Sequence, residues 1–137
     1  NIQTTTENTP TRMLFTSTQF NVGIDMQNNS QMLVQQSGTY NVQFSAQIYR
    51  TNGGTNQHVD IWFAVNGLDL PYSDTKVTVA NNGHFVVASW NYFVYLNAGD
   101  YVEIMWSTTA STIQLQSEIA GIHPDVPSTI ATIYRIN

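Results

Sequence analysis

The chain has 137 residues, and only 9% of them are charged, against about 25% in an ordinary soluble domain. Thr, Asn, Gln and Ser take the place of the missing charges with 52 residues between them, and a face of such neutral side chains does not repel its own copies. The net charge of −5, with 4 scattered basic residues, excludes the basic stripe of a nucleic-acid-binding protein, and the lack of cysteine excludes disulfides and thiolate metal sites.

The N-terminal segment, residues 1–11, is rich in Thr and Asn and almost free of apolar side chains, which predicts a flexible arm or linker. We expect residues 12–137 to form a single domain, because a chain of this length buries most of its own apolar surface. A first strand is predicted at 12–20, and a second segment, 25–36, carries a turn at residues 28–30. No apolar run approaches the ~20 residues of a membrane span, so we expect no membrane insertion.

Strict alternation of apolar and polar residues predicts the central strands. Every second side chain from Tyr40 to Ile48 is apolar, and the same holds from Val59 to Val65, after which Asn66-Gly67 supplies a turn. A strand points successive side chains to opposite faces, so each of these strands has one buried and one solvated side. A short strand is predicted at 76–80.

The C-terminal half continues the pattern with predicted strands at 85–96, 101–107, 113–116 and 129–136. A tight turn lies at 97–100, and a loop containing Gly and Pro lies at 119–128. We find no amphipathic helix and no internal repeat. The pattern predicts an all-β fold, a jelly-roll β-sandwich of about eight to ten antiparallel strands.

Two of the predicted strands are apolar on both faces. Segment 85–96 carries apolar side chains on the side predicted to face the core and also on its opposite side. The last predicted strand, 129–136, is likewise apolar on both sides. A strand with two apolar faces is buried on both, so we expect another subunit to cover the second face; a surface loop lying over these strands is the alternative. The expected subunit interface consists of Phe85, Val87, Phe93, Tyr95, Tyr134 and Ile136.

Two sequence pieces carry a family resemblance: residues 37–44, Ser-Gly-Thr-Tyr-Asn-Val-Gln-Phe, and residues 93–102, Phe-Val-Tyr-Leu-Asn-Ala-Gly-Asp-Tyr-Val. The first resembles the Gly, aliphatic, Tyr-x-Phe strand of the complement globular heads and the wider tumour-necrosis-factor-like superfamily. The second resembles that family's Leu-x-x-Gly-Asp-x-aliphatic hairpin. The resemblance implies a jelly roll of about ten strands that assembles as a tight homotrimer, with the final strand in the inner sheet.

The composition of residues 96–106, which are rich in neutral polar and aromatic side chains, resembles that of related domains in structural proteins of tailed bacteriophages. There such domains form fibre heads, capsid decorations or tail appendages. The chain lacks the cysteines and the collagen-like stalk of the animal members. We therefore expect a non-enzymatic structural protein of the virion, with its own copies and other virion proteins as partners and, where it mediates attachment, a host surface glycan or receptor.

The residue types at Gly99-Asp100 favour a tight turn for physical reasons that do not depend on the family resemblance. Glycine tolerates a positive φ that other residues resist, and an adjacent Asp can accept backbone N–H bonds that hold the turn. This turn sets the register of the two strands that flank it, and a slip by one residue would turn their core side chains outward. Gly38, which precedes the strand at Tyr40, is the other predicted structural turn residue.

Candidate chemistry is sparse. His58 and Asp60 share a strand face and are weak candidates for a metal site, and Asp25, Asp69 and Asp74 offer oxygens to calcium without forming a dense Asp loop. A polar strand face and solvated loops explain these residues more simply, so we expect no cofactor. Neither a Gly-x-Ser-x-Gly elbow nor a phosphate-binding glycine loop occurs, and we expect no enzymatic activity.

Aromatic residues offer a different function, because aromatic rings stack on sugars. Trp90 and Trp106 are in phase with aliphatic core positions and are predicted to be core residues. Trp62 is out of phase with the core, and Tyr49 and Tyr72 lie near turns, so these three are the ligand-binding candidates. They support the alternative function, a carbohydrate- or receptor-binding module of a secreted or cell-surface, and therefore extracellular, protein.

Overall fold

The structure is a computed structural model that describes all 137 residues, and it contains β-strands and no helix. This confirms the all-β prediction. None of its segments is a helix long and apolar enough to cross a membrane. The strands are β1 (Thr11–Arg12), β2 (Ile24–Gln27), β3 (Gln31–Val34), β4 (Gly38–Arg50), β5 (Gln57–Val65), β6 (Leu68–Asp69), β7 (Thr75–Val79), β8 (Phe85–Leu96), β9 (Tyr101–Thr108), β10 (Ile113–Leu115) and β11 (Thr129–Arg135).

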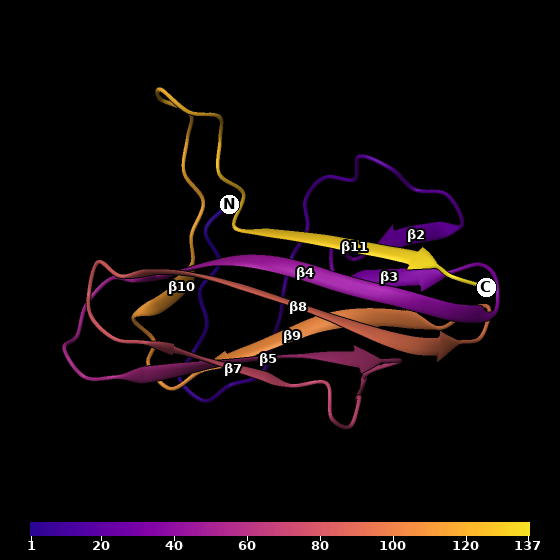
Figure 1. Cartoon of the computed structure of the whole chain (residues 1–137), viewed down its shortest axis with the longest axis horizontal. Coiled ribbons are helices and arrows are strands. Elements are labelled where there is room, and N and C mark those ends of the chain that lie inside the picture. The colour runs from indigo at the N-terminus through magenta and orange to yellow at the C-terminus, as the bar shows by residue number, and fades with distance from the viewer.

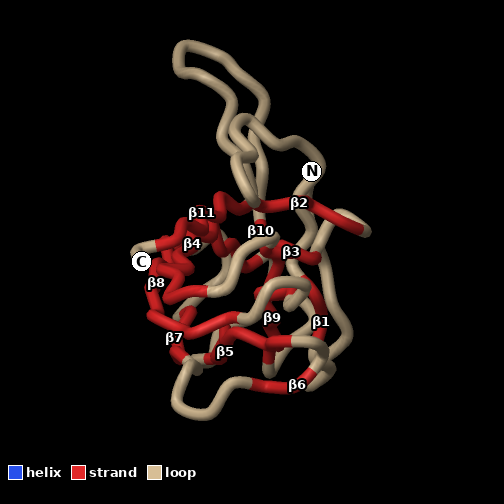
Figure 2. Tube along the Cα trace, turned by 90° about the vertical axis from the view of Figure 1, so that its right-hand side faces the viewer, coloured by secondary structure: helices blue, strands red, loops and turns tan.

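The strands form two antiparallel sheets that pack as a β-sandwich (Figure 1). The larger sheet has the order β2-β3-β9-β5-β6, with β1 also paired to β9 and β7 also paired to β5. In the smaller sheet β4 is central, with β10 and β11 on one flank and β8 on the other. Figure 2 places β4, β8 and β11 together on the left and β1, β3 and β9 on the right.

The core lies between the two sheets and consists of the alternate side chains that the sequence predicts. On β4 the apolar positions from Tyr40 to Ile48 are all buried, and they face the buried positions of β5 and β9. Phe44 of β4 meets Phe63 of β5 edge to face, with ring centroids 5.9 Å apart. Trp106 is fully buried in this cluster, which confirms its predicted core position.

The strand β8 follows the predicted two-sided pattern with one exception. Ala88 and Leu96 are buried on its inner side, and the aromatic and aliphatic residues of its other side are exposed. Trp90 lies in phase with the inner side but is 41% exposed, so its predicted core position is wrong. The physical reason is that β8 is an edge strand that pairs only with β4, so one side of the strand has no neighbouring strand to shield its side chains from water.

The N-terminal region departs from the predicted strand at 12–20. The ladder β1 ends at Arg12, after which Met13 and Phe15 enter the core and residues 16–23 form a loop. The ladder cannot continue because β3 occupies the next part of β9, with Met32 opposite Val102. Within residues 1–11, the segment expected to be an arm, Gln3 exchanges two 2.9 Å backbone hydrogen bonds with Leu115.

A long loop between β10 and β11 projects from the body of the sandwich (Figures 1 and 2). Glu118 and Val126 pair as a short antiparallel bridge at its base. Beyond this bridge Ile119 and Ile122 are almost completely exposed. The loop therefore carries apolar side chains away from the core that could have buried them.

Candidate interaction surfaces

The outward surface of the smaller sheet carries exposed apolar side chains among neutral polar ones. We call it the apolar face and define it as the outward side chains of β4, β8 and β11 together with Ile136, which directly follows β11. Its large apolar members are 48 to 63% exposed, so the alternative of a covering loop is wrong. These members are Phe85, Val87, Phe93, Tyr95, Ile130, Tyr134 and Ile136, which include every residue of the predicted subunit interface.

Strand register divides the apolar face into bands. At one end Asn41 of β4 lies between Tyr134 of β11 and Phe93 of β8. At the other end Tyr49 and Phe85 are cross-strand partners with ring centroids 4.5 Å apart. Short polar side chains fill the middle and leave a hollow of about 390 Å³. This hollow is lined by Gln43, Phe44, Ser45, Ser89, Trp90, Asn91, Ile130 and Thr132.

No outward position of the apolar face carries a charge. Arg135 of β11 is in phase with the inner positions Ala131 and Ile133, and its Nε donates to the carbonyl of Ser37. Removing neutral side chains from water costs far less than removing charged ones. The face therefore has the composition of a surface that can be buried without ion pairs.

Asn41 is a polar residue trapped within the apolar face. It is only 6% exposed, and its Nδ2 donates to the Tyr134 hydroxyl at 2.9 Å. Its Oδ1 is buried and has no hydrogen-bond partner. A buried acceptor without a donor is uncommon and destabilising. The sequence alone did not single out Asn41, because its burial depends on the two aromatic neighbours.

A second hollow, of about 370 Å³, lies on the outward surface of the larger sheet. It brings together two of the three predicted ligand-binding residues, Trp62 and Tyr72, whereas Tyr49 lies on the other sheet. The indole of Trp62 is held in place by a hydrogen bond, since its Nε1 donates to Asp69 Oδ1 at 2.7 Å. We call it the Trp62 hollow, and it is lined by Asp60, Trp62, Asp69, Leu70, Tyr72, Asp74 and Ser107.

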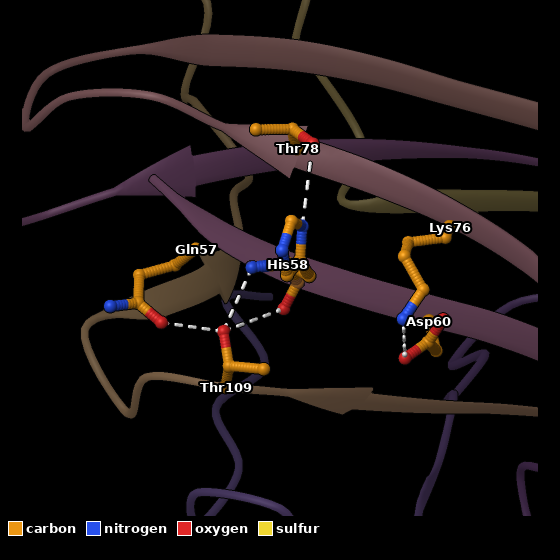
Figure 3. Close-up of polar contacts among 6 residues, drawn as sticks. All are labelled: Gln57, His58, Asp60, Lys76, Thr78 and Thr109. Carbon is orange, nitrogen blue, oxygen red and sulfur yellow. Dashed lines mark hydrogen bonds and ion pairs between the residues drawn. The ribbon is translucent and has the colours of Figure 1, made fainter. Parts of the chain in front are cut away.

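The weak metal candidates His58 and Asp60 contact different partners (Figure 3). His58 Nδ1 lies 3.3 Å from the Thr78 hydroxyl, whereas Asp60 Oδ2 forms an ion pair with Lys76 Nζ at 3.4 Å. The backbone N–H of His58 donates to Thr109 Oγ1, which in turn donates to Gln57 Oε1. These contacts tie β5 to β7 and to the end of β9.

Of the three calcium candidates, Asp69 and Asp74 both line the Trp62 hollow, and only Asp25 lies elsewhere. Asp25 lies on β2 and accepts a hydrogen bond from Gln35, whereas Asp69 lies on β6 at the opposite end of the strand order. Asp74 lies close to Asp60 in the Trp62 hollow. No group of three or more His, Asp or Glu side chains is arranged to hold a metal ion.

Asp74 is electrostatically unusual within the Trp62 hollow. Its pKa is raised above the ordinary value of 3.8, first because burial disfavours the charged carboxylate and second because the negative charge of Asp60 is nearby. Lys76 opposes this effect. A hydrogen bond between the Asp74 and Asp60 carboxyl groups adds to this rise in the pKa, so the hollow contains two crowded and interacting carboxyl groups.

The predicted turn residues lie at the end of the sandwich near the C-terminus. Gly99 has a φ of 94°. Asp100 Oδ2 accepts the backbone N–H of Asn97 at 2.8 Å, and its Oδ1 accepts the side-chain amide of Asn66 at 3.0 Å. Gly38 is not a turn residue as predicted, because it is the first residue of β4 and pairs with Leu96. A Cβ there would clash with the carbonyl oxygen of Asn137, so the close approach of the final residues requires glycine.

Arg50 is a structural residue that no sequence motif indicates. It is 2% exposed, with no carboxylate partner, and its guanidinium donates to the carbonyls of Asn52, Thr55, Val79 and Ala80. It thereby joins the loop after β4 to the end of β7. The only sequence signal is a lone Arg between a strand and a Gly-rich turn.

Comparisons with known proteins add no family assignment. No protein-family model matches the sequence, and no curated protein matches it.

Proposed function

We propose that this chain is a non-enzymatic virion structural protein whose jelly-roll domain assembles as a homotrimer through the apolar face. The observation that carries the proposal is the set of ordered, uncharged and half-exposed aromatic and aliphatic side chains on β8 and β11. Exposed apolar patches bordered by neutral polar side chains often mark protein–protein contact sites. The jelly-roll topology, the trimer and the virion location rest on the resemblance to the complement-head-like domains of tailed bacteriophages.

Burial of the apolar face would supply the driving force for assembly. Each Å² of apolar surface removed from water contributes about 25 cal/mol, and the face lacks charges whose desolvation would oppose it. Bulky residues at its two ends and the hollow between them give a surface into which side chains of a neighbouring subunit can fit.

Other virion proteins are the second class of partner. The projecting loop between β10 and β11 exposes Ile119 and Ile122 outside the sandwich, where they are available to a different chain. In a particle the domain would be the head of a fibre, a capsid decoration or a tail appendage. Mass spectrometry of purified virions tests this location, and absence of the chain from the particles would contradict it.

The oligomeric state tests assembly directly. Native mass spectrometry and light scattering of the purified chain should give three subunits. Val87→Asp and Tyr134→Asp, both on the apolar face, should shift the mass towards one subunit, while Val22→Asp, at a 95% exposed loop position, should leave the trimer intact. A monomer at high concentration for the unaltered chain, or an unchanged trimer in both face variants, would overturn the proposal.

A further inference from the structure

The Trp62 hollow has features that neither the fold nor the proposed assembly requires. The first is Tyr72, which is 96% exposed and has a φ of 64°. A residue other than Gly or Asn in this left-handed region is strained, and an exposed phenol ring contributes nothing to the core. Strain at an exposed aromatic residue beside a hollow is a feature that often accompanies binding sites.

The loop holds Tyr72 in this position through its neighbours. Ser73 is fully buried, and its hydroxyl accepts the backbone N–H of Phe63 at 3.1 Å and lies 2.8 Å from the carbonyl of Leu70. On the other side the Tyr92 hydroxyl donates to the carbonyl of Pro71 at 3.1 Å. The loop is therefore anchored on both sides of Tyr72, and the ring is presented outward from a rigid base.

The opposite wall of the hollow is also held in place. The turn of the β5–β6 hairpin has positive φ at both Asn66 and Gly67, and it brings Asp69 of β6 back beside β5. There Asp69 fixes the indole of Trp62 through the 2.7 Å hydrogen bond to Nε1. Two aromatic side chains from different elements thus border one hollow without packing into a core.

The polar lining consists of acceptors that need donors. Asp60, Asp69 and Asp74 are carboxyl side chains, and Asp60 and Asp74 lie close enough together for their negative charges to repel. Ser107, the cross-strand neighbour of Asp60, adds a hydroxyl. Lys76 is the only cation paired with this group. Hydroxyl and ammonium donors are favoured by such a lining, and anions are repelled.

We propose that the Trp62 hollow binds a residue of an uncharged or amino sugar, with the Trp62 and Tyr72 rings contacting its C–H face and the Asp60 and Asp69 carboxylates accepting its hydroxyl or ammonium hydrogens. A pyranose combines an apolar face with several hydroxyl donors, which matches an aromatic and carboxylate lining. Sugars that bear a carboxylate, sulfate or phosphate are excluded by the carboxylates of the hollow. The proposal does not rest on the proposed assembly, because every lining residue belongs to one chain.

The test is binding to a glycan array of hexose, free amino-sugar and acidic oligosaccharides, followed by titration of the best hit with the full chain in solution. We expect hits in the first or second class and none that requires an acidic group. Trp62→Ala and Tyr72→Ala should each weaken binding more than tenfold, whereas Phe20→Ala, which removes a 91% exposed ring elsewhere, should change it less than twofold.

A further variant separates binding from folding. Tyr72→Gly removes the ring and relieves the positive-φ strain, so the melting temperature should stay the same or rise while binding falls more than tenfold. Tyr72→Phe should retain binding, because the stacking face remains. The proposal is overturned if neutral and amino glycans fail to bind at millimolar concentration, if only acidic glycans bind, or if Trp62→Ala and Tyr72→Gly bind like the unaltered chain.

Assembly and sugar binding can fail independently. Val87→Asp lies on the other sheet and should keep the solution affinity of a single subunit for the sugar, even when it abolishes assembly. A variant with intact assembly and no sugar binding would overturn only this inference. A monomeric chain that still binds sugar would overturn only the proposed trimer.

Discussion

Asn41 and Tyr134 are joined by a 2.9 Å hydrogen bond across the apolar face, and this bond satisfies only the amino half of the Asn41 amide. Tyr134→Phe would remove the acceptor and leave a buried amide with no partner. We expect the free energy of unfolding of the subunit to fall by about 1–3 kcal/mol. Urea denaturation under conditions that dissociate the assembly measures this change.

The double variant Asn41→Val/Tyr134→Phe is the matched control, because it removes both polar groups together. Replacing both partners of a buried hydrogen bond by apolar groups is close to neutral, so the double variant should be more stable than Tyr134→Phe alone. Strictly additive losses in this double-mutant cycle would show that the two side chains are not coupled.

Phe44→Ala tests the assignment of the inner face of β4. The ring is 4% exposed and contacts Phe63 edge to face, so its removal leaves a cavity between the sheets. We expect the free energy of unfolding to fall by about 3–5 kcal/mol. Phe20→Ala, at an exposed position, should have almost no effect. A loss below ~1 kcal/mol in Phe44→Ala would contradict the assignment.

The sequence predicted the faces of the strands well, because the alternation of side chains is a local property of extended backbone. The inner positions of β4 from Tyr40 to Ile48 and the exposed apolar side of β8 follow directly from this period. Periodicity does not report which strand lies at an edge, and for that reason it predicts a core position for Trp90 that the structure does not show. The predicted strand at 12–20 was too long for a related reason: its length depends on how β3 and β1 share β9.

The Trp62 hollow could be predicted only in part. The phase of Trp62 placed it outside the core, and Tyr72 was selected because it lies near a turn. The proximity of Trp62 and Tyr72 to Asp69 depends on the β5–β6 hairpin and on buried Ser73, which anchors the loop. These are tertiary contacts, which a local sequence pattern does not reveal. The partners of Arg50 are equally non-local, since two of its acceptors are about thirty residues away in the chain.

Gly99→Val should lower the free energy of unfolding by more than ~1 kcal/mol. The cause would be backbone strain alone, because φ is 94° and a Cβ at this position would meet no atom within 4 Å. Gly54→Val is the matched control: it also has open space and no left-handed φ, so the change should stay within about 0.5 kcal/mol. Equal melting temperatures for Gly99→Val and the unaltered chain would contradict the role of this turn.

Arg50→Met should be among the most damaging changes outside the apolar core. It would leave the carbonyls of Asn52, Val79 and Ala80 without their buried donor, and we expect a loss of about 3 kcal/mol in the free energy of unfolding. Arg50→Lys should recover only part of this loss, because one ammonium group cannot reach all the carbonyls that the planar guanidinium reaches.

Arg135→Met provides the comparison for Arg50. Arg135 is exposed, and its Nε donates to the carbonyl of Ser37. Its replacement should cost less than about 1 kcal/mol, because water can take over the lost hydrogen bond. Denaturant titration of the variants decides the matter: if Arg50→Met and Arg135→Met lose similar stability, the guanidinium of Arg50 does not hold the two loops together.

Asp74→Asn should stabilise the protein at neutral pH, and the gain should disappear in acid. Burial and the charge of Asp60 raise the pKa of Asp74 in the folded chain above its ordinary value of 3.8. Folding therefore opposes ionisation of Asp74: the penalty is absent below pH 3.8, grows as the pH rises above this value, and is complete above the folded pKa.

Asparagine cannot ionise, so the variant avoids this penalty at every pH. The gain at neutral pH should stay below about 1 kcal/mol, because the hollow is partly open to water and Lys76 already offsets some of the repulsion. Unfolding by urea at neutral pH and again below pH 3.8 measures both limits. A gain of equal size at the two pH values would indicate a packing effect, and a loss at neutral pH would show that Asp74 stabilises the fold as a carboxylate.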